Sequence, residues 1–311
     1  MSSIVVASWD VDGQASASML IRSGYVETVY YPPVGMYKLS DDEVDILSGY
    51  DYIYIVDMHL TRRDVERLST SSYVYIIDDS PIHPNYNGLD VSCTCYKSYS
   101  TTYILMESMG VEPDIDALLG MYNDSGDKVI NSEYWDIFWN YLDSVDMGLD
   151  DMKRIVRLMN IPMYLGDQEG LYRNTDALVN RLEGLNLDKY ADMEELLESY
   201  IGELVNDSID VDGIRLLRYS GRYYVIGEVV KRLFRDGITT AVAIDQGFLP
   251  SYTMVAVASR GSLSRLLLKL IEMDLPAGGE EHFLGVLVDK GIEARILKIM
   301  SEYIGVKLDE Y

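Results

Sequence analysis

Short apolar runs alternate with segments of helical periodicity through the first 122 residues of the chain. Each run is brief, almost unbroken and rich in β-branched or aromatic residues, as is typical of strands buried on both faces. Strands that alternate with helices in this way predict an α/β domain with a mostly parallel sheet and helical crossovers. The strands are expected at Ile4–Ser8, Glu27–Tyr31, Asp51–Asp57 and Tyr73–Ile77, and the helices at Ala15–Ser23, Thr61–Leu68, Ser100–Gly110 and Ile115–Tyr122.

The pattern changes after residue 130. The next segment is mostly helical and acidic, and its aromatic run Tyr134–Trp139 has the spacing of a core-facing helix. Polar residues at Asn206–Asp212 predict an interdomain linker. We therefore expect an α/β domain at 1–130, an acidic helical segment with linker at 131–209, and a smaller α/β domain at 210–311. In the last domain we expect strands at Ile214–Tyr219, Tyr223–Ile226, Thr240–Ile244 and Tyr252–Ala258, and helices at Ser262–Met273 and Ile292–Ile304.

Length and composition agree with two folded domains, because 311 residues with 48% hydrophobic content can fill two cores. No stretch approaches the roughly 20 apolar residues that span a bilayer, and the start lacks a basic region. We therefore expect a cytoplasmic protein that does not bind membranes.

Two cysteines, Cys93 and Cys95, are separated by one residue. Side chains alternate between the two sides of an extended segment, and on this ground we expect neither a disulfide nor a metal chelate. The expectation is two small buried side chains.

The net charge of −25 is unevenly distributed. Residues 1–209 carry 37 acidic and 13 basic residues, whereas residues 210–311 carry 14 and 13. The acidic part repels a phosphate backbone unless metal ions intervene. If the protein binds single-stranded DNA, we expect residues 210–311 to do so.

Aspartates follow the predicted strands. Asp10 and Asp12 come after the first, Asp57 ends another, and Asp78 and Asp79 follow a third. Ligands of open parallel sheets collect outside the carboxyl ends of the strands, so these side chains should converge on one crevice. Together with Asp124 further along the chain, they offer hard oxygen ligands that suit Mg²⁺ or Mn²⁺ and the hydrolysis of a phosphodiester.

The order of these motifs resembles that of the DHH phosphoesterases. Ser8–Gly13 is similar to the opening His-x-Asp-x-Asp-Gly motif, and Ile55–Asp57 resembles the second motif. Asp78–Ser80 aligns with the Asp-His-His that names the family, and Gly120–Gly126 resembles the fourth motif. Gly278–Gly285 is similar to the glycine motif of the associated DHHA1 domain. The resemblance implies a DHH-like domain, a helical connector and a DHHA1-like domain.

The departures from the family pattern fall on its histidines. Ser8 replaces the first one, Asp79 and Ser80 replace the name-giving pair, and Glu280 replaces the histidine of the glycine motif. The chain's own histidines, none at a family ligand position, are His59, His83 and His282, and we expect His83 to be an ordinary loop residue beside prolines. The resemblance thus implies a vestigial catalytic site at Ser8, Asp78 and Ser80. The ligands left for residual Mn²⁺ or Mg²⁺ are Asp10, Asp12, Asp57, Asp79 and Asp124.

Among family members with such losses, the chain most resembles the RecJ-like subunit of the archaeal CMG helicase complex. That resemblance implies an inactive or feeble scaffold of DNA replication that binds GINS and MCM proteins. We expect the acidic segment 131–206 to supply the docking surface.

Two other functions are open. The first is a Mn²⁺-dependent phosphoesterase or 5′–3′ exonuclease that acts on single-stranded DNA, short RNA or a small nucleotide. Arg260 and Arg265 would then hold phosphate, although ordinary charges at a helix end are an equal alternative. The second is a module that binds a nucleotide through Gly278 and Gly279 without cleaving it, where a simple turn is the alternative.

Overall fold

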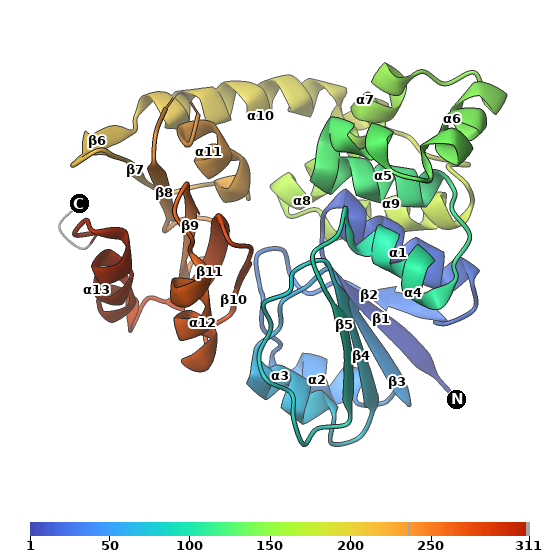
Figure 1. Ribbon diagram of the computed structural model, residues 1–311, viewed down its shortest axis with the longest axis horizontal. Helices are drawn as coiled ribbons and strands as arrows, with labels where there is room; N and C mark the ends of the chain where they lie inside the picture. The colour runs from blue at the N-terminus through green and yellow to red at the C-terminus, as the bar shows by residue number, and fades with distance from the viewer. Residues whose placement is uncertain (236, 309–311) are drawn as a thin grey trace.

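The first sheet carries the predicted alternation of strands and helices. In the computed structural model, which describes residues 1–235 and 237–308, five parallel strands lie in the order β2-β1-β3-β4-β5. The apolar runs are buried because helices cover both faces of the sheet (Figure 1). The strands are β1 (Ser3–Ala7), β2 (Thr28–Tyr30), β3 (Tyr52–Val56), β4 (Tyr73–Asp78) and β5 (Val91–Cys95).

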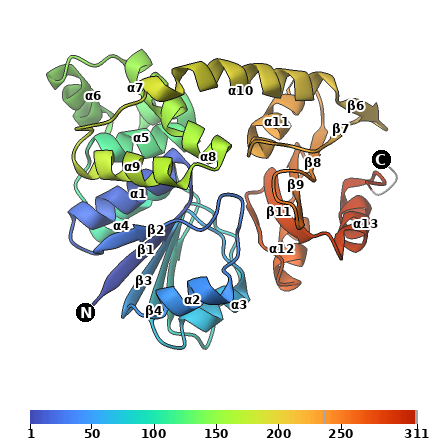
Figure 2. The same cartoon turned by 180° about the vertical axis from the view of Figure 1, so that it is seen from behind.

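Two groups of helices enclose this sheet. One face is covered by α1 (Val11–Arg22), α4 (Thr101–Met109), α5 (Ile115–Ser125) and α9 (Gln168–Val179). The shorter α2 (Asp41–Leu47) and α3 (Arg62–Leu68) lie on the other face (Figures 1 and 2). Side-chain caps set where these helices begin, for example Thr61, whose hydroxyl accepts a bond from the Asp64 N–H.

A helical connector joins the two sheets. It contains the 3₁₀ helix Gly126–Asn131, α6 (Trp135–Ser144), α7 (Leu149–Met159), α8 (Ile161–Leu165) and the long α10 (Asp188–Asn206), which reaches the second sheet (Figure 2). The prediction of a core aromatic run fits Phe138, which is fully buried. It is wrong for Trp139, because this side chain is 49% exposed on the outer side of α6.

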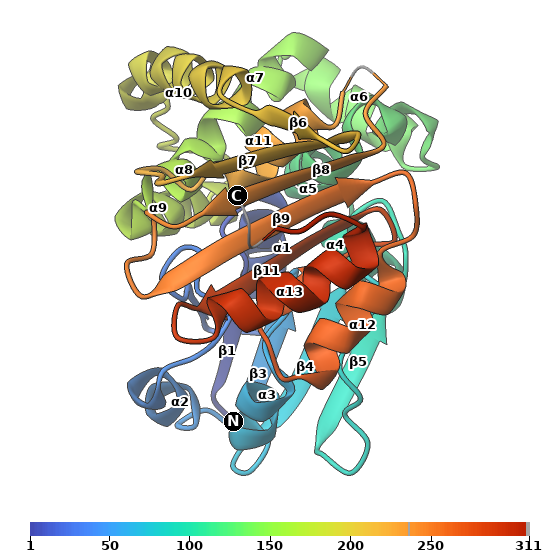
Figure 3. The same cartoon turned by 90° about the vertical axis from the view of Figure 1, so that its left-hand side faces the viewer.

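The second sheet is mixed, with strands in the order β10-β11-β9-β8-β7-β6. Among the strand pairs that the structure describes in this second sheet, β7 and β8 are parallel and the others are antiparallel. Helices α12 and α13 cover the outer face, while α11 lies on the other face (Figure 3). The elements are β6 (Ile209–Val211), β7 (Ile214–Tyr219), α11 (Ile226–Leu233), β8 (Thr240–Asp245), β9 (Tyr252–Ser259), α12 (Ser264–Glu272), β10 (Ala277–Gly279), β11 (Phe283–Asp289) and α13 (Glu293–Ile304).

The prediction of an α/β protein with a parallel sheet is confirmed, with two corrections to single elements. The expected linker contains β6, which pairs with β7. The expected strand at Tyr223–Ile226 is a turn that leads into α11. Its apolar side chains are explained by packing, since Tyr223 and Val225 are buried in the core shared with α10. No helix of the described residues is long and apolar enough to cross a membrane.

The expectation for the cysteines is wrong. Cys93 and Cys95 are joined by a disulfide, with their Cα atoms 5.5 Å apart, and Cys93 is exposed. Residues i and i+2 of a strand point to the same face, because only adjacent residues alternate. The two sulfur atoms of β5 therefore lie on one side of an edge strand, where they can bond.

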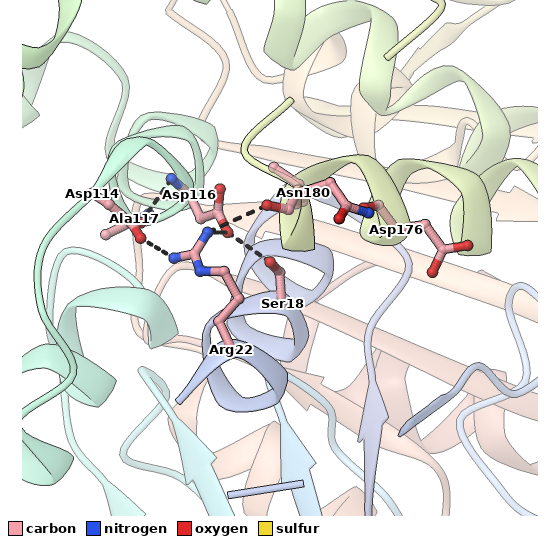
Figure 4. Close-up of polar contacts among 8 residues, drawn as sticks. Ser18, Arg22, Asp114, Asp116, Ala117, Asp176 and Asn180 are labelled. Carbon is pink, nitrogen blue, oxygen red and sulfur yellow. Dashed lines mark hydrogen bonds and ion pairs between the residues drawn. The ribbon is translucent and has the colours of Figure 1, made fainter. Parts of the chain in front are cut away.

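A buried ion pair fastens α1 to α5. Arg22, in the last turn of α1, donates to Asp116 at 2.7 Å and also pairs with Asp114 (Figure 4). Ser18 donates to the same Asp116 oxygen at 2.6 Å, and the Asp116 side chain has no solvent exposure. A buried carboxylate without its partner is strongly destabilising, so Arg22 is required where the two helices meet.

We expect Arg22→Ala to lower the free energy of unfolding by about 3–5 kcal/mol, because it leaves Asp116 buried and unpaired. Urea unfolding followed by circular dichroism measures this loss. The control is Arg173→Ala, since Arg173 is half exposed and pairs with Asp167 and Glu169 on the surface. That change should cost less than about 1 kcal/mol. Equal losses in the two variants would contradict the assigned role of Arg22.

Candidate metal centre

The carboxyl ends of β1, β3 and β4 bring the predicted aspartates to one edge of the sheet. Asp10 follows β1 and caps α1, where its side chain accepts the Gly13 N–H at 3.1 Å. Asp57 follows β3 and Asp79 follows β4, while Asp124 reaches the same place from α5. The carboxylate oxygens of Asp12, Asp57 and Asp124 lie within 4.8 Å of one another. We call Asp10, Asp12, Asp57, Asp79 and Asp124 the carboxylate cluster.

Asp12 is the most deeply buried member of the carboxylate cluster. It is completely buried in α1 and accepts the N–H groups of Thr101 at 2.7 Å and Thr102 at 3.1 Å. These donors belong to the first turn of α4, where the helix dipole favours an anion. A Cβ atom on Gly120 would lie 2.5 Å from Asp12 Oδ1, so only glycine lets α5 approach this closely.

Asp57 adopts a strained backbone, with φ of 53°. Left-handed conformations are uncommon outside glycine, although aspartate tolerates them, and they concentrate at functional sites. Ser8 donates a hydrogen bond to Asp57 and lies 2.9 Å from Asp10 Oδ1. Its hydroxyl therefore links two carboxylates at the position where the family pattern has an imidazole.

Two asparagines that the sequence reasoning missed also hold the cluster. The Asn123 amide donates to Asp10 at 3.0 Å and to Asp124 at 2.8 Å. Asn160, at the start of α8, donates to Asn123 at 2.8 Å and accepts the Val11 N–H at 3.1 Å. The proximity of Asn123 to Asp124 in the chain was a usable signal, but nothing local pointed to Asn160.

The carboxylates raise one another's pKa. Burial and the neighbouring Asp10 raise the pKa of Asp12 to about 6. Burial and the charges of Asp12, Asp78, Glu280 and Asp10 raise the pKa of Asp79 to about 8. Partial burial and nearby aspartates place the pKa of Asp57 well above the ordinary range, and the charges of Asp12, Asp10 and Asp79 raise that of Asp124, which is exposed to solvent. Within residues 1–235 and 237–308, no lysine, arginine or histidine forms an ion pair with the cluster.

This arrangement fits a divalent cation. Several carboxylate oxygens converge, their mutual repulsion has no cationic partner, and backbone N–H groups orient Asp12 from behind. Mg²⁺ and Mn²⁺ prefer such oxygen ligands, and a bound ion would favour the charged forms. Asp12, Asp57 and Asp124 would hold it, and Asp10 and Asp79 lie close enough for their charges to act on the same ion.

Two of the three residues expected in a vestigial catalytic site lie apart from the cluster. Asp78 faces His59 and His83, and these imidazoles lower its pKa although burial raises it. Ser80 donates to the carbonyl of Gly279 at 2.8 Å and so joins the two domains. His83 lies in the expected loop, but its side chain is only 6% exposed and stacks on His59.

The residues proposed for phosphate or nucleotide contact do not contact the cluster. Arg260 donates to the Ile238 carbonyl at 3.3 Å, and Arg265 is exposed on α12. Gly278 and Gly279 form β10 and pack against the first domain instead of forming an open loop. The sequence reasoning overlooked Lys231 of α11. The Lys231 side chain is 62% exposed and pairs with Glu228 at 3.1 Å, and the charges of Glu228, Asp124 and Asp10 raise its pKa.

Comparison with known proteins identifies solved structures with a similar fold. No family model matches the sequence, and no curated protein matches it either. Among solved structures, RecJ from Thermus thermophilus in complex with Mn²⁺ has a TM-score of 0.58 and 18% identity. The alignment covers 97% of this chain and 52% of that RecJ, so the chain spans about half of its length.

Two further structures have the same fold. An exonuclease RecJ bound to manganese has a TM-score of 0.55 and 17% identity, over 97% of this chain and 90% of that one. The DHH domain of PF0399, a member of the s1p family of ribosomal proteins, has a TM-score of 0.51 and 11% identity. That alignment covers 97% of this chain and 86% of the other. Identities this low establish the fold alone.

Without metal, we expect the thermal stability of the protein to fall from about pH 5 to about pH 8. The raised pKa values mean that the folded state binds more protons than the unfolded chain in this range, so the free energy of unfolding decreases as pH rises. Thermal unfolding in EDTA measures the trend, and added Mn²⁺ should restore stability at the higher pH. In the control Asp57→Asn/Asp124→Asn, both effects should be smaller. A melting temperature that rises with pH in EDTA would contradict the interpretation.

Proposed function

We propose that this chain, which has the RecJ-like fold of the DHH superfamily, is a scaffold protein that binds a divalent cation and hydrolyses phosphodiesters feebly or not at all. The observation that carries the proposal is that the two serines at family histidine positions form structural hydrogen bonds. Ser8 links Asp10 and Asp57, and Ser80 bonds the Gly279 carbonyl of the second domain. Both hydroxyls therefore support structure, and a neutral hydroxyl is a poor ligand for a divalent ion.

The negative charge of the site also opposes the binding of a phosphodiester, which is itself negatively charged. The charge of Glu280 raises the pKa of Asp79, which shows that Glu280 lies near the cluster. In the family pattern, the position of Glu280 is a histidine. Its ion pair with Lys97 is largely exposed, at 3.4 Å, and so compensates little of the repulsion. General acid–base catalysis needs a group that titrates beside the attacking water or the leaving group, and imidazole usually fills this role. The cluster has carboxylates in place of an imidazole, and a bound cation would lower their pKa values and so weaken them as proton acceptors.

The acidic connector supplies a surface for a protein partner. On α6, Ile137 and Trp139 are 47% and 49% exposed, and the nearby Val145 is 46% exposed. Trp139 also packs on Trp135, with ring centroids 5.9 Å apart, and exposed aromatic side chains on an otherwise polar surface are typical of protein interaction sites. From the resemblance of the motifs, we propose that the partners are GINS and MCM-type replication proteins, and that residues 210–311 contact single-stranded DNA.

We expect the purified protein to release no nucleotide from end-labelled single-stranded DNA or RNA with Mn²⁺ or Mg²⁺. The reason is that the groups which would bind phosphate and transfer protons are replaced. Asp57→Ala is measured in parallel, and circular dichroism verifies that both proteins are folded. Cleavage by the wild type that Asp57→Ala abolishes would contradict the scaffold proposal.

We expect Ile137→Asp/Trp139→Ala to weaken co-purification with the GINS and MCM proteins of the same organism at least about tenfold, because central aromatic contacts dominate interface energies. The control is Leu268→Ala on α12, a residue that is 46% exposed in the other domain. Unchanged capture by the α6 variant would remove this surface from the proposal.

A Mn²⁺-dependent phosphoesterase is the second candidate, and Lys231 is the observation in its favour. Its side chain is 62% exposed beside Glu228, the charges of Asp124 and Asp10 contribute to its raised pKa, and on this ground we propose that it faces a phosphate held by a cation at the cluster. If wild type cleaves and Asp57→Ala does not, Lys231→Gln should raise KM more than it lowers kcat. Lys269→Gln, on the exposed part of α12, is the matched control.

A further inference from the structure

Two of the three histidines form a second polar group, distinct from the carboxylate cluster. The rings of His59 and His83 are stacked with centroids 4.3 Å apart, and each Nε2 lies 3.6 Å from Asp78 Oδ1. The side chains of His59, Asp78 and His83 are 10%, 3% and 6% exposed. Three polar side chains from two separate loops and a strand end thus meet in the interior.

This group is not satisfied by the protein. His59 Nδ1, both nitrogens of His83 and Asp78 Oδ2 are buried and have no hydrogen-bond partner among the described residues. An unmet buried polar group costs about 1–3 kcal/mol, so four of them in one place point to a bound ligand, and His83 Nε2 is the one of the four that also faces Asp78 Oδ1.

The spacing suits a transition-metal ion. With metal–nitrogen and metal–oxygen distances near 2.1 Å, ligand atoms of a tetrahedral site lie about 3.4 Å apart. The two 3.6 Å separations are close to this value, but the rings are stacked at an interplanar angle of 17°, so one ring must turn before both nitrogen lone pairs point at one ion. Imidazole with a carboxylate suits Zn²⁺ and similar ions, whereas Mg²⁺ prefers oxygen ligands alone.

The nearby cysteines do not provide the site as the structure stands. Cys93 and Cys95 lie close enough to His83 to form a cluster with it, but their sulfur atoms are bonded to each other. Thiolates, not disulfide sulfurs, are the metal ligands. The buried atoms without hydrogen-bond partners belong to the two histidines and Asp78, so we assign the metal site to these three residues.

We propose that His59, Asp78 and His83 bind one Zn²⁺-class ion, which fastens the loops after β3 and β4 to the second domain. Gly278 of β10 lies directly on His59, because a Cβ atom there would be 2.8 Å from the His59 ring. Ser80, two residues after Asp78, bonds Gly279 beside it. The ion would therefore stiffen the contact between the two domains. This site is independent of the function proposed for the carboxylate cluster.

The test is equilibrium dialysis of EDTA-treated full-length protein against ZnCl₂ with excess Mg²⁺ and without thiols. The Mg²⁺ occupies the carboxylate cluster, and the absence of thiols preserves the disulfide. We expect one Zn²⁺ per wild-type chain and at least about tenfold weaker binding in His59→Gln and His83→Gln. His282→Gln, Asp57→Asn and Cys93→Ser/Cys95→Ser should bind as the wild type does, since none of these side chains belongs to the site.

A second readout needs no variant. In nuclear magnetic resonance spectra of wild-type protein with labelled histidine, Zn²⁺ should shift two of the three imidazole signals and leave that of the exposed His282 unchanged. Equal Zn²⁺ binding in wild type and both histidine variants would overturn the proposal. So would a loss of binding confined to the cysteine or Asp57 variant, or unshifted imidazole signals.

Discussion

Repulsion among closely spaced carboxylates is the constraint on which the architecture of the site depends. Asp12, Asp57 and Asp124 meet at the carboxyl end of a parallel sheet, and no basic group of the described residues forms an ion pair with them. The fold opposes this repulsion with neutral donors: backbone N–H groups of α4, the Ser8 hydroxyl and the Asn123 amide. These donors hold the carboxylates in place but do not neutralise them. A bound cation would supply the missing charge.

The two domains meet close to this cluster, and small residues allow the contact. Ser80 and Gly278 bring β10 against the loops that follow β3 and β4, while Tyr37 and Tyr224 share a hydrogen bond of 2.6 Å across the same junction. Positions that the DHH pattern uses for catalysis therefore serve here in part to hold the domains together.

Much of the fold followed from local pattern, because buried parallel strands and capped helices have strong short-range signatures. The aspartates were predicted at one edge for the same reason, since each follows an apolar run such as Tyr52–Val56. Edge strands were harder to predict from the sequence. β10 is three residues long, and the pairing of Val91–Cys95 with β4 depends on tertiary context.

The rest of the site depends on contacts between distant segments. His59 and His83 belong to different loops, and only the folded chain stacks them beside Asp78. Asn160 reaches Asn123 from 37 residues away. The cysteine prediction failed for a different reason, a geometric one: positions two apart share one side of a strand, and the disulfide uses that side.

The most direct test of the account is a Mn²⁺ titration of the wild type and of Asp57→Asn/Asp124→Asn, with free Mn²⁺ measured by electron paramagnetic resonance. The account predicts that the wild type removes the free Mn²⁺ signal until at least one ion is bound per chain, and that the variant removes far less. A wild-type protein that leaves the signal unchanged when protein is in excess would contradict the claim that the carboxylates converge to hold a cation.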